Sequence, residues 1–279
     1  MIYPVVGGFR MVSGKKGFFD GKPEAFSMEE SEHAYIIRSK EHEMILQKET
    51  LEISIDRKAI TNLKNISFIF EKESVSASRI QFSIHENSAI YGFGERFDSV
   101  NQYGKTVALW QRDACEGCLA SIGNQAYKNI PLVHTSDGFS FFANTSYRMR
   151  MDVGDAVQDY LSVEALGDVF DFYIWSGTPR EAMTAYGTLT GLPIFPPEWV
   201  FEPWAGGGGG RWRNGPLQDI ALEQMAAMKK FHELDIPHSG FYAEGAGGTF
   251  YGEYKKEELY KVVSVSYTHL RAHETCADL

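Results

Sequence analysis

The sequence predicts an antiparallel β-sandwich that is followed by a single strand–helix–strand unit. Short segments in which polar and apolar residues alternate run from Tyr35 to about Trp175, with turn residues between them. The spacing then becomes helical near Thr178, and prolines cluster after it. Many short strands with few helical stretches are typical of an antiparallel sandwich. A strand, a helix and a strand in succession form the building block of a parallel sheet or barrel.

The strands of the sandwich are predicted from a period of two residues. Leu51–Asp56 alternates strictly between apolar and polar side chains, which indicates a strand with one buried face. Ile66–Phe70 and Ile80–Ile84 alternate in the same way. Phe139–Asn144 and Val169–Trp175 are richer in aromatic residues and are predicted to be core strands.

A helix is predicted to close this part of the chain. Thr178–Glu181 combines a capping threonine, a proline at the first helical position and a glutamate three residues after the cap. Gly191 fits a helix end, and Pro193, Pro196 and Pro197 cannot continue a helix. We therefore place a domain boundary near residue 192, so that residues 1–192 form the sandwich domain.

The βαβ unit follows this boundary. Trp199–Trp204 is predicted to be a buried strand, Gly206–Gly210 a loop, and Pro216 the start of an amphipathic helix. Phe241–Ala243 is predicted to be a second short strand that ends at Glu244. A (β/α)8 barrel needs eight strand–helix units, so the one and a fraction present here cannot close a barrel.

Composition narrows the possible partners. The 279 residues carry a net charge of -10, which predicts repulsion from nucleic acid and from anionic membrane surfaces. No apolar stretch is long enough to span a bilayer, and Met1–Phe19 holds no continuous apolar region of a secretory signal. We therefore expect a cytoplasmic protein without nucleic-acid or membrane partners.

The cysteines do not predict a metal site. Cys115 and Cys118 form a C-x-x-C pair, and the third cysteine, Cys276, lies far away in the sequence. A structural zinc site needs four ligands, and a redox pair is expected beside a βαβ unit. Plain loop thiols are the expected alternative, so neither a metal nor a cofactor is predicted.

Ser264–Leu279 continues neither pattern and resembles translated sequencing-adapter read-through. We expect the native sequence to stop near Val263, which makes residues 193–263 the second domain and residues 264–279 a non-native tail. The alternative is a native helix, in which His269, His273 and Glu274 could pass for a metal-ligand cluster. The tail is left out of the fold and site predictions.

Four motifs between Tyr91 and Tyr147 identify a family. They are YGFGERF (Tyr91–Phe97), WQRD (Trp110–Asp113), YKNIP (Tyr127–Pro131) and FFANTS (Phe141–Ser146). In this order and spacing they resemble the N-terminal, galactose-mutarotase-like β-sandwich of family 31 glycoside hydrolases, the α-glucosidase and α-xylosidase group. The resemblance implies that the second domain is the start of a (β/α)8 barrel.

The resemblance also implies the parent reaction, which is hydrolysis of an α-glycosidic bond with retention by two carboxylates. In the family both carboxylates lie on later barrel strands, beyond Val263, so no catalytic residue is assigned in this chain. The chain alone is expected to be inactive. The full-length parent is expected to bind a carbohydrate substrate, to need no cofactor, and to be free to form an oligomer.

Two substrate contacts are predicted from the sandwich. Arg112 and Asp113 match the loop by which this domain reaches over the barrel mouth in family α-glucosidases. A second domain can wall a site that the barrel leaves open. The alternative is a structural Arg–Asp pair within a loop.

Three further contacts are predicted from the barrel part. The glycine run lacks the Gly-Lys-Ser/Thr of a phosphate loop, so it is interpreted as a loop at the end of the first barrel strand, where barrel active sites are built. Trp204 and Arg211 would then edge the sugar site; the alternative is a core tryptophan and a solvated arginine. Glu244 resembles the family aspartate that binds substrate hydroxyls, or it is a surface glutamate.

Two architectural predictions accompany these. Gly92 and Gly94 suit a close backbone approach at a strand bend. Glu95 and Arg96, taken as strand neighbours, would point to opposite faces and could not act on one bond.

The rival functions are a non-catalytic carbohydrate-binding or interaction module, and a family member with another donor such as a galactoside, xyloside or sulfoquinovoside. A sandwich that binds alone should end after its last strand, which the βαβ unit argues against. The replacement of the family aspartate by Glu244 leaves the donor sugar open.

Overall fold

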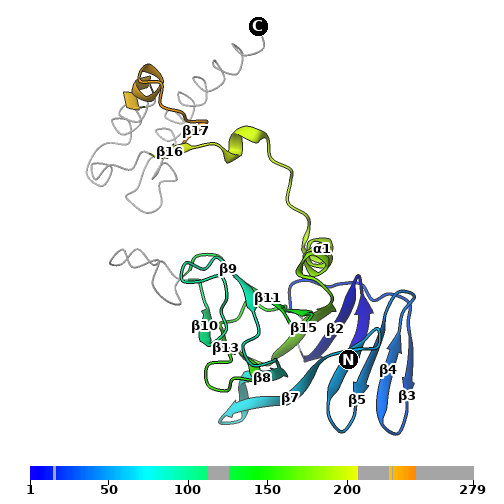
Figure 1. Cartoon of the computed structure of the whole chain (residues 1–279). Coiled ribbons are helices and arrows are strands. Elements are labelled where there is room, and N and C mark those ends of the chain that lie inside the picture. Colours follow the sequence, from blue (N-terminus) through cyan, green and yellow to red (C-terminus); the bar gives the residue numbers. More distant parts are fainter. Residues whose placement is uncertain (15–16, 112–125, 207–225, 228, 243–279) are drawn as a thin grey trace. The chain divides into compact units, whose positions relative to one another are not determined.

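The computed structural model describes residues 1–14, 17–111, 126–206, 226–227 and 229–242. The chain divides into two units, Met1–Pro193 and Ile194–Leu279. The described residues of the first unit form two antiparallel sheets and one helix (Figure 1).

Six strands form the first sheet. Its order is β1 (Ile2–Val5), β2 (Gly8–Gly14), β15 (Val169–Ser176), β12 (Phe139–Ala143), β11 (Asn129–Thr135) and β9 (Ile90–Gly94). All neighbours in this sheet pair antiparallel, including β2 with β15, which are far apart in the sequence.

Nine strands form the second sheet. Its order is β10 (Lys105–Leu109), β13 (Met149–Val153), β14 (Tyr160–Leu166), β8 (Ser74–Ser83), β7 (Lys58–Glu71), β6 (Glu52–Ile55), β5 (Glu43–Gln47), β4 (Ala34–Arg38) and β3 (Ser27–Glu30). These neighbours also pair antiparallel, so the predicted antiparallel β-sandwich is confirmed.

The core lies between the two sheets. The ring of Phe82 on β8 contacts Phe141 on β12 and Phe172 on β15, with ring centroids 4.9 and 5.7 Å apart. Ile53 and Ile55 are buried on β6, as the alternation in Leu51–Asp56 predicts. Ring pairs at these distances add to the stabilisation that comes from burying apolar area.

Every residue of β12 is buried, because the outer face of the six-stranded sheet is covered as well. Helix α1 (Pro179–Thr190) lies on this face, where Tyr186 meets Phe142 edge to face at 5.1 Å. The predicted capping box is present: the Thr178 hydroxyl accepts the N–H of Glu181, and the Glu181 carboxylate accepts the N–H of Thr178. Gly191 is the C-cap of the helix, with φ 97°.

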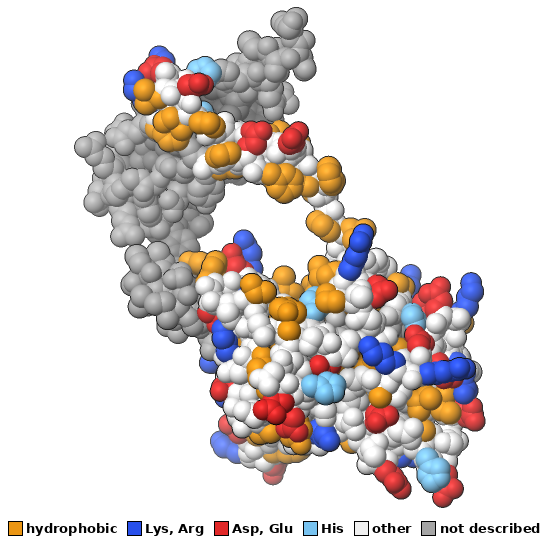
Figure 2. Space-filling view, viewed as in Figure 1, with side chains coloured by type: hydrophobic (Ala, Val, Ile, Leu, Met, Phe, Trp, Pro, Cys, Tyr) orange, Lys and Arg blue, Asp and Glu red, His pale blue; other side chains and the backbone are white. Residues whose placement is uncertain are grey.

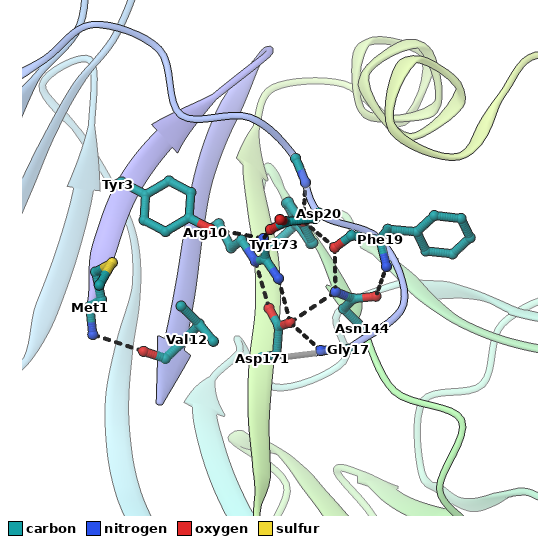
Figure 3. A network of polar contacts seen from close by, with 11 residues as sticks. Met1, Tyr3, Arg10, Val12, Gly17, Phe19, Asp20, Asn144, Asp171 and Tyr173 are labelled. Carbon is teal, nitrogen blue, oxygen red and sulfur yellow. Dashed lines mark hydrogen bonds and ion pairs between the residues drawn. The ribbon is translucent and has the colours of Figure 1, made fainter. Parts of the chain in front are cut away.

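A buried polar network fixes the segment between β2 and β3 to the same face (Figure 3). Arg10 on β2 is fully buried, and its Nε and Nη2 donate to the two carboxylate oxygens of Asp171 on β15 at 2.9 and 2.7 Å. Asp171 also accepts the N–H of Gly17 and a side-chain N–H of Asn144. Two parallel N–H···O bonds between a guanidinium and a carboxylate form a bidentate, charge-assisted pair, which is a strong kind of hydrogen-bonded pair.

In the motif YGFGERF, two glycines allow the close backbone approach that the sequence predicts. Gly92 and Gly94 on β9 have φ of 111° and 83°. A Cβ on Gly92 would lie 2.2 Å from the carbonyl oxygen of Leu132, and one on Gly94 would lie 2.1 Å from that of Lys128. However, β9 ends at Gly94, so Glu95 and Arg96 follow the strand, and the premise that they are strand neighbours is wrong.

The second unit differs from one prediction. The expected buried strand Trp199–Trp204 is instead a 3₁₀ turn, η1 (Glu198–Phe201), followed by the strand β16 (Trp204–Gly206). The physical reason is local: Pro197 caps the turn, and Trp199 and Phe201 are 47 and 76% exposed, so no burial favours an extended segment.

A parallel strand pair is present in this unit. β16 pairs in parallel with β17 (Gly240–Tyr242), close to the predicted second strand, and helical residues 226–227 and 229–233 lie between them in the sequence. The predicted helix start at Pro216 lies outside the described residues. A parallel pair needs a crossover connection, which agrees with a βαβ unit.

Candidate functional site

Residues of three of the four sequence motifs line one hollow of about 340 Å³. Its lining is Leu109, Trp110, Gln111, Asn129, Pro131, Thr145, Ser146, Tyr147 and Met149, and we call it the motif hollow. WQRD supplies Trp110 and Gln111, YKNIP supplies Asn129, and FFANTS supplies Thr145. The segments are distant in sequence. β10 pairs with β13 in the nine-stranded sheet and β11 belongs to the six-stranded sheet, so the pairing and packing of the two sheets bring the segments together.

Two aromatic side chains give the motif hollow its apolar surface. Trp110, directly after β10, is 53% exposed, and Tyr147, between β12 and β13, is 46% exposed. Exposed rings beside polar groups are suited to ligands that present both C–H faces and hydroxyls. A sugar ring is such a ligand.

The polar side of the hollow is a pair of amides. The Nδ2 of Asn129 donates to Gln111 Oε1 at 2.7 Å and to the carbonyl of Ala126 at 3.0 Å. A bridge between Gln111 and Ala126 closes the base of residues 112–125. The hollow therefore lies where the segment that carries Arg112 and Asp113 leaves and rejoins the sandwich.

Arg96, from YGFGERF, supports this pair from below. Its Nη2 donates to Asn129 Oδ1 at 2.7 Å and to the carbonyl of Ala108 at 3.0 Å. Its Nε and Nη1 are shielded from solvent and have no hydrogen-bond partner in the described part of the chain. Burial lowers the pKa of Arg96, and the charge of Asp98 opposes this effect. The guanidinium stays charged and orients the Asn129 amide.

These residues were missed in the sequence analysis, although their motifs were quoted. The signal was that Arg96, Trp110 and Asn129 each belong to one of the four motifs, and Tyr147 follows the fourth. Motif membership alone does not say which side chains of a motif converge, because convergence depends on strand pairing across the sheet.

Of the predicted site residues, only Trp204 is described. Arg112, Asp113, Arg211 and Glu244 lie outside the described residues. Trp204 begins β16, is 48% exposed, and its ring lies 5.6 Å from that of Trp199. Its Nε1 donates to the carbonyl of Val200 at 3.1 Å. The contact of Trp204 with a sugar stays a prediction.

The described residues hold no group of three His, Cys, Asp or Glu side chains that could bind a metal ion. The predicted C-x-x-C pair lies outside them. Among the same residues, no helix has both the length and the apolar character to cross a membrane.

The paired strands of the first unit define an antiparallel β-sandwich. Residues 18–152 match the glycosyl hydrolase 31 N-terminal galactose mutarotase-like domain, so the chain carries the N-terminal domain of glycoside hydrolase family 31.

Relatives of known name agree. The chain is 34% identical over 166 residues to alpha-xylosidase XylQ of Lactiplantibacillus pentosus, which covers 59% of this chain and 21% of that protein. It is 24% identical over 226 residues to alpha-glucosidase 2 of Bacillus thermoamyloliquefaciens, which covers 78% of this chain and 27% of the relative. The chain thus spans about a fifth to a quarter of the relatives it matches.

The fold also matches a solved structure. The cycloalternan-forming enzyme from Listeria monocytogenes, in complex with a pentasaccharide substrate, superposes with a TM-score of 0.67 at 19% identity. The match covers 84% of this chain and 23% of that one. At this identity the likeness supports the fold.

Proposed function

We propose that this chain is the substrate-facing N-terminal part of a retaining α-glycosidase. The observation that carries the proposal is that three of the four motifs line the motif hollow, at the base of residues 112–125, while Arg96 of the fourth motif donates to Asn129 in that lining. In this proposal Arg112 and Asp113 contact the substrate, while Trp110 and Tyr147 shape the wall from which their loop extends.

The second unit is proposed to begin a (β/α)8 barrel. The parallel pairing of β16 with β17 supports this, because barrel strands are parallel and their C-terminal ends carry the active site. Arg211 and Glu244 follow the two strands in sequence, so they are proposed to contact the sugar that is transferred. Trp204 begins β16, but this strand is only three residues long, so the indole is proposed to reach the sugar as well.

The chemistry needs two carboxylates. One attacks the anomeric carbon and expels the leaving group, which the other protonates; the second carboxylate then takes a proton from the water that releases the sugar. We propose that neither lies within the 279 residues, and that this chain alone does not turn over glycosides. The donor to test first is an α-xyloside, because the 34% identical relative is named an alpha-xylosidase. Glucosides, galactosides and sulfoquinovosides are the alternatives.

The test has two steps. The purified 279-residue chain is assayed with aryl α-xyloside, α-glucoside and α-galactoside, and no release of the aryl group is expected. The source DNA is then sequenced beyond the codon for Val263, and the longer product is assayed. Continued strand–helix units and retaining hydrolysis by that product are expected. Turnover by the 279-residue chain, or a longer product without any activity on these α-glycosides, would contradict the proposal.

The motif hollow makes a residue-level prediction for the longer product. Trp110→Ala should lower kcat/KM about fivefold to tenfold, since the stacking contact of one aromatic ring is lost. Phe26→Ala is the matched control, because Phe26 is also exposed, at 45%, but lies beside the edge strand β3. Equal kinetics of both variants and the parent would show that the hollow does not contact substrate.

A further inference from the structure

A second hollow, of about 190 Å³, lies on the solvent face of the nine-stranded sheet over β8, β14 and β13. It shares no lining residue with the motif hollow. We call it the outer hollow; its polar lining is Arg79, Gln81, Arg150, Asp152, Ser162 and Glu164.

Strand register places these six side chains in two rows. Gln81 lies opposite Ser162, which lies opposite Asp152. Arg79 lies opposite Glu164, which lies opposite Arg150. Directly paired residues of antiparallel strands point to the same face, and residues two apart share it. The intervening residues of these strands, such as Ile80, Met151 and Val163, are buried in the core.

A loop turns this flat face into a hollow. Asp152 accepts the backbone N–H groups of Asp155 and Ala156 at 3.0 and 3.2 Å. The Thr106 hydroxyl donates to Asp155 at 2.8 Å, which ties the same loop to β10. Ala156, Val157 and Tyr160 then form the wall, and Val157 is 46% exposed.

Several side chains of the outer hollow have donors and acceptors that their hydrogen bonds within the described residues do not fully use. Arg79 makes both its bonds to Oε2 of Glu164, at 3.1 and 2.5 Å. Within the described part of the chain, Arg150 makes one long bond, 3.4 Å to the Thr106 hydroxyl, and Gln81 makes one of 3.4 Å to Ser162. The guanidinium of Arg150, the carbonyl of Gln81 and Oε1 of Glu164 can therefore serve a ligand.

The charges in the outer hollow balance. Arg79 and Arg150 are offset by Asp152 and Glu164, so neither an anion nor a cation is favoured. Solvent faces of antiparallel sheets are commonly polar, so polarity by itself carries no conclusion. This face differs from an ordinary polar sheet face in two ways. It is concave, and it holds adjacent donors and acceptors that the described residues do not fully use.

We propose that the outer hollow is a non-catalytic binding site for neutral oligosaccharides. A sugar hydroxyl both donates and accepts, which matches an arginine donor beside carboxylate and amide acceptors. The wall of Val157 and Tyr160 offers apolar contact to sugar C–H groups. Such a site would hold a glycan chain on the sandwich, and it goes beyond the proposed glycosidase function because it needs no catalytic residue.

The proposal is tested with the 279-residue chain by isothermal titration with maltodextrin, dextran and a xyloglucan oligosaccharide. Binding of at least one probe is expected. The double variant Gln81→Ala/Arg150→Ala should weaken it by about tenfold or more, since charged and neutral hydrogen bonds are lost together. Arg180→Ala is the control, because Arg180 is an exposed arginine on α1. Ala156→Tyr, on the exposed loop, should fill the hollow and block binding in case the double variant does not fold.

The outcomes separate the two sites. Absence of binding of every probe to the parent chain overturns the proposal, as does unchanged binding by both Ala156→Tyr and a folded double variant. If Trp110→Ala abolishes binding and these variants do not, the glycan binds the motif hollow. That result overturns the outer site and leaves the proposed function intact.

Discussion

At the scale of single residues, Arg10 forms ion pairs with two carboxylates that are expected to contribute differently to the stability of the fold. Its side chain is fully buried, and so is that of Asp171, whereas the side chain of Asp20 is 67% exposed. Burial acts to lower the pKa of Arg10, but the hydrogen bonds to Asp171 and Asp20 outweigh it and the pKa is raised. The guanidinium is therefore charged at every pH at which the domain folds.

Asp171→Asn should lower the free energy of unfolding by about 3–5 kcal/mol, because it leaves the Arg10 charge buried without its partner. Asp20→Asn should cost less, about 1 kcal/mol, because the Asp20 side chain is largely exposed and Arg10 keeps its buried partner Asp171. Urea unfolding of both variants measures the difference. Similar losses in the two variants would contradict the assignment of the buried pair as the stabilising one.

Asp98, in the loop between β9 and β10, is expected to make the stability of the domain depend on pH in the acid range. Burial acts to raise its pKa, but the Lys105 ammonium at 2.6 Å, the Gln102 amide and the N–H of Ser99 lower it from 3.8 to about 2. A carboxylate with a depressed pKa stabilises the fold above its unfolded pKa, and this contribution is lost as the pH falls through the folded value.

The difference in unfolding free energy between the parent and Asp98→Asn should therefore be largest above pH about 4 and shrink toward pH about 2. Urea unfolding across that range measures it. Lys105→Met should narrow the same difference, since it removes the charge that depresses the pKa. A difference in unfolding free energy that does not change with pH would show that Asp98 stabilises the fold through the shape of its side chain and not through its charge.

At the scale of elements, the fit of β9 against β11 depends on a residue without a side chain. Gly92→Ala should destabilise the domain by at least about 2 kcal/mol, because it combines a positive φ with a Cβ clash against the Leu132 carbonyl. Gly104→Ala is the matched control: its φ is 77°, but no atom lies within 4 Å of the new Cβ, so only about 1 kcal/mol of backbone strain is expected. Thermal unfolding measures the stability lost in each variant. Equal losses would contradict a role for the close approach of Gly92 to the Leu132 carbonyl.

Elements with a local signal could be predicted from the sequence, and those set by distant pairing could not. The alternation in β6 and the capping box of α1 lie within a few residues, so both were predicted and are confirmed. No strand was predicted before Tyr35, yet β2 pairs with β15 and carries Arg10 to Asp171. The motif hollow is likewise a product of strand order, which a pattern along the chain does not contain.

At the scale of the whole molecule, the residues that follow α1 are apolar and exposed. Leu192, Ile194 and Phe195 are 74, 87 and 98% exposed, and Figure 2 shows hydrophobic side chains along the segment that leaves α1. On the visible face of the sandwich, by contrast, acidic and basic side chains are interspersed. Exposed apolar residues in a segment without regular structure are the expected target of a protease that cuts after aromatic residues.

Chymotrypsin does not cut before proline, so Phe195, which precedes Pro196, is not a target. Among the described residues, limited chymotrypsin digestion should cut first at Phe201, which is 76% exposed and precedes Glu202, and leave a resistant product that ends near that residue, which mass spectrometry identifies. Phe18 is the internal control, because it is also exposed, at 74%, but its neighbours Gly17 and Phe19 donate their N–H groups to Asp171 and Asn144. Cleavage requires the backbone to leave its hydrogen bonds, so Phe18 should survive while Phe201 does not. In Asp171→Asn the bond from Gly17 loses its charged acceptor, and cleavage at Phe18 should appear. A parent chain that resists cleavage at Phe201, or is cut at Phe18 as fast, would contradict this ordering of local stability.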